Sequence, residues 1–205
     1  MSSIIKSSVD ESYRLAPLFF FSGFAALVYQ ICWQRLLFAS FGVDLESVTI
    51  IVSAFMMGLG LGSLVGGYLA DMWPTRTVQL FATSEVCIGI FGWFSPELLQ
   101  SAGEYFVKSD SLTIAMVNFL LLLIPTSLMG STLPILVSNV TRKWKNVGKS
   151  IGFLYQINTL GAALAVLTMG FLWFLFFELN TAIRAAAILN IMISLGTLAW
   201  IKKDV

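Results

Sequence analysis

Six long, nearly uncharged runs constrain this chain more than any other feature of its sequence. Five carry no charge at all, residues 15–34, 47–70, 111–141, 150–177 and 185–201, and the sixth, 77–96, is interrupted only by Glu85. A helix needs about 17 to 25 mostly apolar residues to cross the hydrocarbon core of a bilayer. The sequence therefore predicts an all-α bundle of six transmembrane helices, at residues 15–41, 45–70, 76–97, 111–139, 150–177 and 181–201.

The residues outside these runs leave no room for a soluble domain. We expect a cytoplasmic amino-terminal segment at 1–14, a six-helix transmembrane domain at 15–201 and a cytoplasmic tail at 202–205. The longest polar loop, about residues 97 to 110, cannot bury a core of its own. Asp10 and Glu11 lie where a signal peptide carries basic residues, so we expect the first helix to be retained.

Basic residues are unevenly divided between the two sides of the predicted bundle. If the helices alternate in direction, three of them (Arg35, Lys108 and Arg184) fall on one side and nine on the other. The nine are Lys6, Arg14, Arg76, Arg142, Lys143, Lys145, Lys149, Lys202 and Lys203. Lys and Arg collect on the cytoplasmic side of membrane proteins. We therefore expect a multi-pass protein of the cell inner (cytoplasmic) membrane with both termini in the cytoplasm.

The composition argues against several classes of function. The net charge is +1, and the absence of a large basic field argues against nucleic acid as a partner. The chain has no histidine, and its two cysteines, Cys32 and Cys87, both lie in predicted helices. The glycine-rich run 58–67 resembles a phosphate-binding loop, but it lies inside an apolar helix and opens no βα unit. We therefore expect no metal, no cofactor and no enzyme activity.

Glycines at helical spacing predict close contacts between helices. Gly58, Gly62 and Gly66 are spaced by four residues in the second predicted helix, and Gly161 lies in a small-residue patch of the fifth. Small residues at this spacing let two helix backbones approach closely. The contact could lie within one chain or across a homodimer, and the spacing does not distinguish the two.

Polar residues inside the predicted helices are the candidate lining of a solute pathway. Glu85 lies near mid-membrane, where a charged side chain costs on the order of 3 kcal/mol, so we expect it to face the bundle and to have a polar partner on the first or fifth helix. It is either a structural hydrogen-bonding group or a proton- or cation-binding carboxylate. The other candidate lining residues are Gln30, Arg35, Gln156 and Asn158.

Two local patterns accompany these candidates. Pro125 and Pro134 predict a kink or break in the fourth helix. At the end of the second helix, Gly67–Arg76 resembles the cytoplasmic turn between helices 2 and 3 of the major facilitator superfamily. In that turn we expect Asp71 and Arg76 to pair across the bend that Pro74 enforces.

Four longer segments resemble the membrane half of bacterial fused spermidine synthase-like proteins. They are FSGFAALVYQICWQRLL, FMMGLGLGSLVGGYLAD, PTSLMGSTLPIL and LYQINTLGAALAVLTMGF. That membrane half is itself similar to six helices of the major facilitator fold, so the resemblance implies a 3+3 inverted repeat. In the fused proteins a soluble synthase domain follows, and the motifs of that enzyme are not in this sequence.

These observations leave two functional hypotheses. The first is a half-size, facilitator-like module that transports a small polar or cationic solute as an oligomer. The alternative is a non-catalytic accessory or structural subunit of a larger membrane complex. The expected partners are membrane lipids and either a second copy of the chain or other membrane subunits.

Overall fold

The computed structural model describes the backbone of residues 2–41, 44–106 and 109–201, and the side chains of 13–39, 48–106, 109–110 and 112–199. Within these ranges the chain is all helical. The α-helices are α1 (Ser2–Phe41), α2 (Asp44–Met72), α3 (Thr77–Tyr105), α4 (Ser111–Trp144), α5 (Val147–Thr168), α6 (Phe174–Phe176) and α7 (Leu179–Ile201), and a π-helical turn, η1 (Met169–Trp173), joins α5 to α6. Six helical segments of the described chain are long and apolar enough to cross a membrane, which is the architecture of a multi-pass membrane protein.

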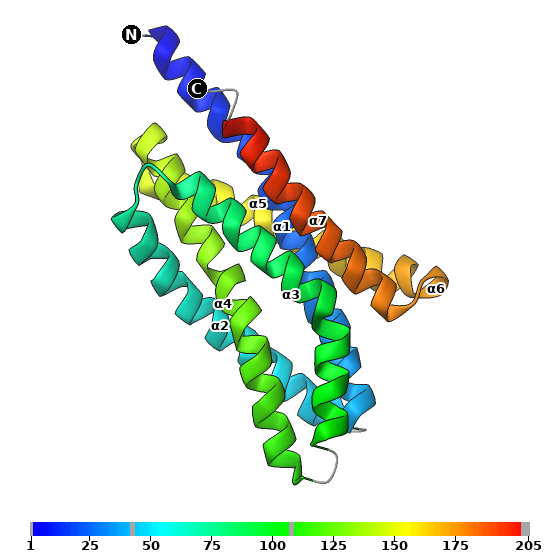
Figure 1. Cartoon of the computed structure of the whole chain (residues 1–205). Coiled ribbons are helices and arrows are strands. Elements are labelled where there is room, and N and C mark those ends of the chain that lie inside the picture. Colours follow the sequence, from blue (N-terminus) through cyan, green and yellow to red (C-terminus); the bar gives the residue numbers. More distant parts are fainter. Residues whose placement is uncertain (1, 42–43, 107–108, 202–205) are drawn as a thin grey trace.

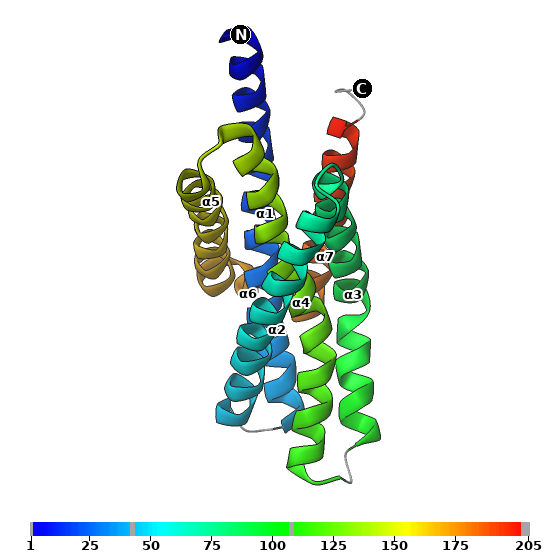
Figure 2. The same ribbon diagram turned by 90° about the vertical axis from the view of Figure 1, so that its left-hand side faces the viewer.

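The helices alternate in direction, so successive connections lie at opposite ends of the bundle. The α2–α3 and α4–α5 connections lie at the end where α1 begins and α7 finishes (Figure 1). The last residues of α1 and α3 and the first residues of α2 and α4 lie at the other end in both views (Figure 2). The most extensive packing joins α2 to α4, followed by α3 to α7 and α1 to α5. The fold therefore consists of closely packed helix pairs rather than of helices wound around one central helix.

Small residues set how closely the paired helices approach. Three glycines of α2 lie against α4: Gly58, Gly62 and Gly66. A Cβ atom added at Gly62 would overlap the backbone of Ser127, and a Cβ added at Gly161 of α5 would overlap the backbone of Phe20 on α1. Because the helix backbones touch at these points, a side chain larger than hydrogen cannot be accommodated without moving a helix.

Several helices extend beyond the runs that predict them. α1 begins at Ser2 instead of residue 15, and α3 continues to Tyr105 instead of 97. The predicted loop 97–110 is therefore helical over most of its length, and Gln100 Nε2 donates to Glu104 Oε1 over 3.1 Å within it. Hydropathy marks the part of a helix that crosses hydrocarbon, whereas the ends are decided by hydrogen bonds in the polar region.

Side-chain caps fix the start of two helices. Asp110 Oδ2 accepts a hydrogen bond from Thr113 N over 3.2 Å at the start of α4, and Asn146 Oδ1 accepts one from Lys149 N over 3.0 Å at the start of α5. Asp and Asn are preferred caps because their side-chain oxygens satisfy amide groups that lack a helical partner. The hydroxyl and amide of Thr113 also lower the pKa of Asp110, since both bonds favour the ionised carboxylate.

α4 runs unbroken through Pro125 and Pro134, so of the predicted kink or break the break does not occur. Pro134 has no N–H to give to the carbonyl of Gly130, four residues earlier. Ser63 Oγ on α2 lies 3.3 Å from that Gly130 oxygen and 2.7 Å from the Leu59 oxygen of its own helix. A neighbouring helix thus offers a donor to the carbonyl that the proline leaves without one.

The α2–α3 connection is a tight turn at Pro74 and Thr75. The expected pairing of Asp71 with Arg76 does not form: both side chains are exposed, and no ion pair joins them among the described side chains. Water competes effectively for such exposed charges, so the pair would stabilise the turn little.

Thr77 makes the polar contact that holds this end of the bundle together. It is buried at the start of α3, and its Oγ1 accepts from Asn139 Nδ2 over 3.0 Å and from Arg142 Nη2 over 3.3 Å. The start of α3 is therefore tied to the end of α4 by side chains that the turn signature does not include.

Candidate functional site

A cavity of about 220 Å³ lies inside the bundle, with lining residues from α1, α2, α3, α4, α5 and α7. Six of the lining side chains are polar: Ser22, Ser63, Thr132, Tyr155, Asn158 and Asn190. Apolar side chains, including Phe19, Leu59 and Met129, complete the wall. Ser63 and Tyr155 are exposed, so the cavity reaches the surface between α2 and α5.

The cavity lies at membrane depth. Ser63 precedes the end of α2 by nine residues and Asn158 follows the start of α5 by eleven. At about 1.5 Å per residue, both positions lie roughly 15 Å from these helix ends. Because the hydrocarbon core is about 30 Å thick, the polar wall is surrounded by the apolar part of the bilayer.

Glu85 of α3 lies fully buried directly behind the cavity wall. Ser22 Oγ donates to Glu85 Oε1 and Asn190 Nδ2 donates to Glu85 Oε2, each over 2.6 Å. The hydroxyl of Tyr29 donates to Asn190 Oδ1 over 3.0 Å and holds that amide in place. Since Ser22 and Asn190 also line the cavity, the carboxylate is separated from the cavity by one layer of side chains.

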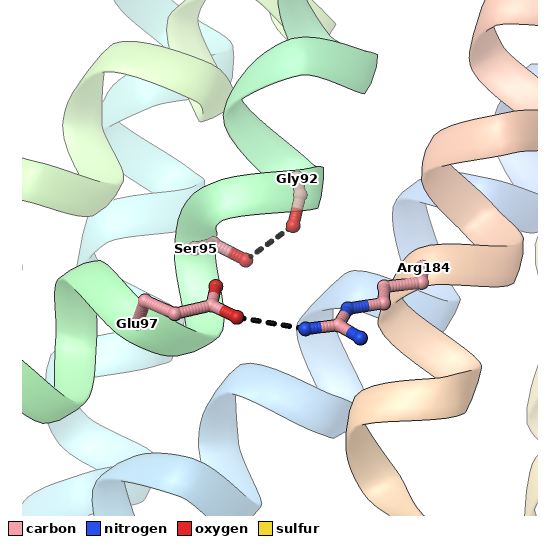
Figure 3. A network of polar contacts seen from close by, with 4 residues as sticks. All are labelled: Gly92, Ser95, Glu97 and Arg184. Carbon is pink, nitrogen blue, oxygen red and sulfur yellow. Dashed lines mark hydrogen bonds and ion pairs between the residues drawn. The ribbon is translucent and has the colours of Figure 1, made fainter.

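The described basic side chains of the neighbouring helices make their contacts away from Glu85. Arg184 of α7 forms an ion pair with Glu97, with 2.8 Å between Nη2 and Oε1, and Figure 3 shows the two side chains facing each other across α3 and α7. Glu97 follows Glu85 by about 18 Å along α3, at about 1.5 Å per residue. Arg35 of α1 lies over the ring of Phe174, 3.8 Å from its centroid. Among the described side chains, Glu85 is therefore stabilised by neutral hydrogen-bond donors and by no cation.

The structure brings together two of the five candidate pathway residues. Asn158 lines the cavity and Glu85 lies behind its wall. Gln30 is half-buried on α1 and Arg35 is exposed at the far end of that helix, and neither lines the cavity. Gln156 is exposed on the outer face of α5. Gln30, Arg35 and Gln156 thus lie outside this cavity, and their part in a solute pathway stays a prediction.

The partner expected for Glu85 on the first helix is present, and it is Ser22. The second partner, Asn190, was not anticipated, and neither were Ser63 and Thr132 as lining residues. Asn190 did carry a signal, because it is the one amide side chain in the uncharged run 185–201. Serine and threonine give a weaker signal, since they are common in transmembrane helices and often bond their own helix, as Thr132 does with Met129 O over 2.7 Å.

A second cavity of about 220 Å³ lies between α1, η1 and α7. Its wall is apolar apart from the indole of Trp173, and includes Phe24, Val28 and Met192. It offers almost nothing that could hold a polar solute in place. The polar cavity is therefore the candidate functional site. Comparisons of the chain with protein-family models, with curated proteins and with solved structures found no match.

Proposed function

We propose that this protein is a half-size, facilitator-like membrane module that moves a small polar or cationic solute as an oligomer. The observation that carries the proposal is the cavity lined by six polar side chains at membrane depth. Polar groups in hydrocarbon are costly and typically mark substrate or ion pathways. Hydroxyl and amide groups can both donate to and accept from a solute, and the carboxylate of Glu85 behind them favours a positive charge in the cavity.

A 3+3 inverted repeat is part of the proposal, and the helix contacts support it. Gly62 of α2 lies against Ser127 of α4, and Gly161 of α5 lies against Phe20 of α1. Likewise Gly130 of α4 lies against Leu59 of α2, and Gly23 of α1 lies against Asn158 of α5. A shift of 107 residues carries Phe20 to Ser127 and Gly23 to Gly130, and a shift of 99 carries Leu59 to Asn158 and Gly62 to Gly161. Two close contacts between α1 and α5 thus correspond to two close contacts between α2 and α4, as an inverted repeat would require.

The burial pattern supports the same correspondence. Eight buried residues of α1 have counterparts 107 positions later that are also buried. They are Leu15, Phe19, Ser22, Gly23, Ala25, Val28, Tyr29 and Trp33, matched by Leu122, Thr126, Met129, Gly130, Thr132, Ile135, Leu136 and Val140. Because α1 and α4 run in opposite directions, the two halves would be related by a two-fold axis in the membrane plane.

Under the proposed repeat, the cavity would lie where the two halves meet. Six of the residues that line the cavity form three pairs that the same shifts of 107 and 99 residues relate. The pairs are Ser22 with Met129, Ala26 with Leu133, and Leu59 with Asn158. Secondary transporters bind their substrates at the interface between such repeats, near the middle of the membrane. This position favours a solute site over a packing defect.

The opening of the cavity supports an oligomer. The wall reaches the surface between α2 and α5, whose outer faces have no partner in the described structure. A Cβ added at Gly60 or Gly67 of α2, or at Gly152 of α5, would meet nothing within 4 Å. Gln156 is exposed beside Gly152 at membrane depth. A second copy packed on this face would give the glutamine a polar partner and would close the cavity against lipid.

In the proposed orientation, the protein spans the inner (cytoplasmic) membrane and both of its termini lie on the cytoplasmic side. The described basic residues of the two connections, Arg76, Arg142, Lys143 and Lys145, lie at the end where α1 begins. Cysteines placed in the segments 142–149 and 99–109, which the sequence predicts to be loops, should react with an impermeant reagent from opposite sides of the membrane. Reaction of both segments from one side would contradict this orientation.

The resemblance to the membrane half of fused spermidine synthase-like proteins remains a proposal, and so does the link to polyamines that it suggests. A second candidate, the accessory subunit, requires no cavity that exchanges solute with water. The polar cavity therefore favours the transport module.

Solute uptake into proteoliposomes tests the proposal. We would measure the uptake of labelled methylammonium, guanidinium, putrescine and urea against protein-free liposomes. The proposal expects uptake of at least one solute, reduced about tenfold or more by Asn158→Leu because the lining amide is lost. Ile90→Leu, an exposed position on α3, is the matched control and should not change it. Uptake equal to that of empty liposomes for every solute would favour the accessory subunit.

A further inference from the structure

The surroundings of Glu85 restrict what this carboxylate can bind. Its two oxygens each accept a hydrogen bond over 2.6 Å, from Ser22 and from Asn190. The side chain is fully buried and does not line the cavity. A metal ion needs several oxygen ligands arranged around open space, which this arrangement does not provide. A proton needs only one carboxylate oxygen.

The groups facing Glu85 are neutral or weakly acidic. α1 contributes Ser22 and the phenol of Tyr29, with Cys32 one turn further along, and α7 contributes Asn190. Ser84, the neighbour of Glu85 on α3, bonds Ser131 of α4 over 3.4 Å. Among the described side chains, no basic group forms an ion pair with Glu85. The described groups around the carboxylate thus provide hydrogen-bond donors but no positive counterion, and a proton or a cation in the cavity is the remaining means of neutralising its charge.

The two bonds also connect the protonation state of Glu85 to the cavity wall. When Glu85 is ionised, Ser22 and Asn190 both donate toward it. When Glu85 carries a proton, it becomes a donor, and one of its two partners must accept instead. The hydroxyl of Ser22, which lines the cavity, can do so by rotating, and its own hydrogen is then free to bond another acceptor. A proton on Glu85 therefore makes the wall more favourable to hydrogen-bond acceptors and removes the negative charge that attracts a cation.

We propose that Glu85 binds a proton in exchange with a cationic solute in the cavity, so that one monovalent cation enters as one proton leaves. This inference rests on the proposed function and deepens it. The proton leaves the carboxyl oxygen for cavity water past Ser22 and Asn190, and it returns when the cation departs. The proton on Glu85 and the cation in the cavity would lie one side-chain layer apart in a medium of low dielectric. The binding of the proton therefore weakens the binding of the cation, and the reverse also holds. By linkage, a cation in the cavity must lower the pH at which Glu85 becomes half protonated, and the effect is reciprocal.

A fixed charge in the cavity tests the exchange without knowledge of the solute. Ser63 lines the cavity near its opening, and Ser63→Arg places a permanent cation there, whereas Ser63→Gln places a neutral polar group. In lipid nanodiscs, infrared difference spectroscopy would follow the C=O band of the protonated carboxylic acid during a pH titration. Glu85→Gln assigns the band by removing it. Glu97→Gln, which changes an exposed glutamate on the same helix, should leave it unchanged.

We expect the midpoint of the Glu85 titration to lie at least about one pH unit lower in Ser63→Arg than in Ser63→Gln, which is a tenfold change in proton affinity. Equal midpoints, or the absence of any titrating band that Glu85→Gln removes, would overturn the inference. If either variant fails to fold, Asn158→Arg and Asn158→Gln make the same comparison from α5. Failure here with solute uptake intact in proteoliposomes would leave the proposed function standing. If the Glu85 midpoint shifts as predicted but the parent protein takes up no solute in proteoliposomes, only the transport role is contradicted.

Discussion

Gly62 of α2 lies so close to Ser127 of α4 that a Cβ atom on the glycine would overlap the serine backbone. The overlap involves backbone atoms, so a rotamer change cannot relieve it. Gly60 lies two residues away on the same helix and has nothing within 4 Å of an added Cβ. The two glycines thus separate the effect of close packing from the effect of simply replacing a glycine in this helix.

Gly62→Leu should therefore destabilise the fold of each chain, whereas Gly60→Leu, on the face of the proposed dimer, should leave that fold intact. Forcing a large side chain into a well-packed contact costs about 1–3 kcal/mol or more, and here the helices must separate to admit it. Thermal unfolding in detergent, read by size-exclusion chromatography of the remaining folded protein, would compare the two variants. A Gly62→Leu variant as stable as the parent would contradict the packing.

The proposed repeat adds a second pair of glycines to this comparison. Gly161, the counterpart of Gly62, lies against the backbone of Phe20, whereas Gly152 is open. Gly161→Leu should be about as damaging as Gly62→Leu, and Gly152→Leu should fold. Tolerance of Gly161→Leu would argue that the two contacts are not equivalent.

Replacement of Glu85 should separate its hydrogen-bonding role from its charge. Glu85→Gln keeps the size of the side chain and, after rotation of the Asn190 amide, can keep hydrogen bonds to both neighbours. Glu85→Leu leaves the buried polar groups of Ser22 and Asn190 without that partner, at a cost of about 1–3 kcal/mol. We expect Glu85→Gln to unfold near the parent temperature in lipid nanodiscs and Glu85→Leu to unfold clearly lower. Equal stability of the two variants would show that these bonds contribute little.

A cysteine at Gln156 should report the contact between two copies. Gln156 is exposed on the α5 face beside the cavity opening, and Leu195 is exposed on α7, on a face that the proposed dimer leaves to lipid. In a background without Cys32 and Cys87, mild oxidation should link Gln156→Cys into a dimer and leave Leu195→Cys monomeric. A dimer through Leu195→Cys and none through Gln156→Cys would place the contact on the other side of the bundle.

The sequence carries much of the fold because two of its signals are local. Uncharged length identifies the transmembrane helices, and the spacing of Gly58, Gly62 and Gly66 marks a face of close contact. The depth of Glu85 likewise predicts that it faces the bundle and needs a polar partner. Each of these conclusions depends only on the helix that contains the residue.

The remaining features depend on which helices meet, and a single helix does not encode that. Gln156 and Asn158 are two residues apart and therefore face different sides of α5, and the side that faces inward is decided by the contact of Gly161 with α1. Asn190 reaches Glu85 from a helix 105 residues further along the chain. The sequence indicates that both residues are polar, but it does not indicate that they touch.

The central claim is that the polar cavity exchanges its contents with water on both sides of the membrane, and the reactivity of a cysteine within it tests this most directly. Thr132→Cys, in the same cysteine-free background, places a thiol on a nearly buried position of the cavity wall. An impermeant, positively charged thiol reagent would be added separately to each side of sealed membranes. The account predicts modification from both sides, because a transport module opens its site alternately. No modification from either side, with a cysteine in an exposed loop reacting normally, would contradict it.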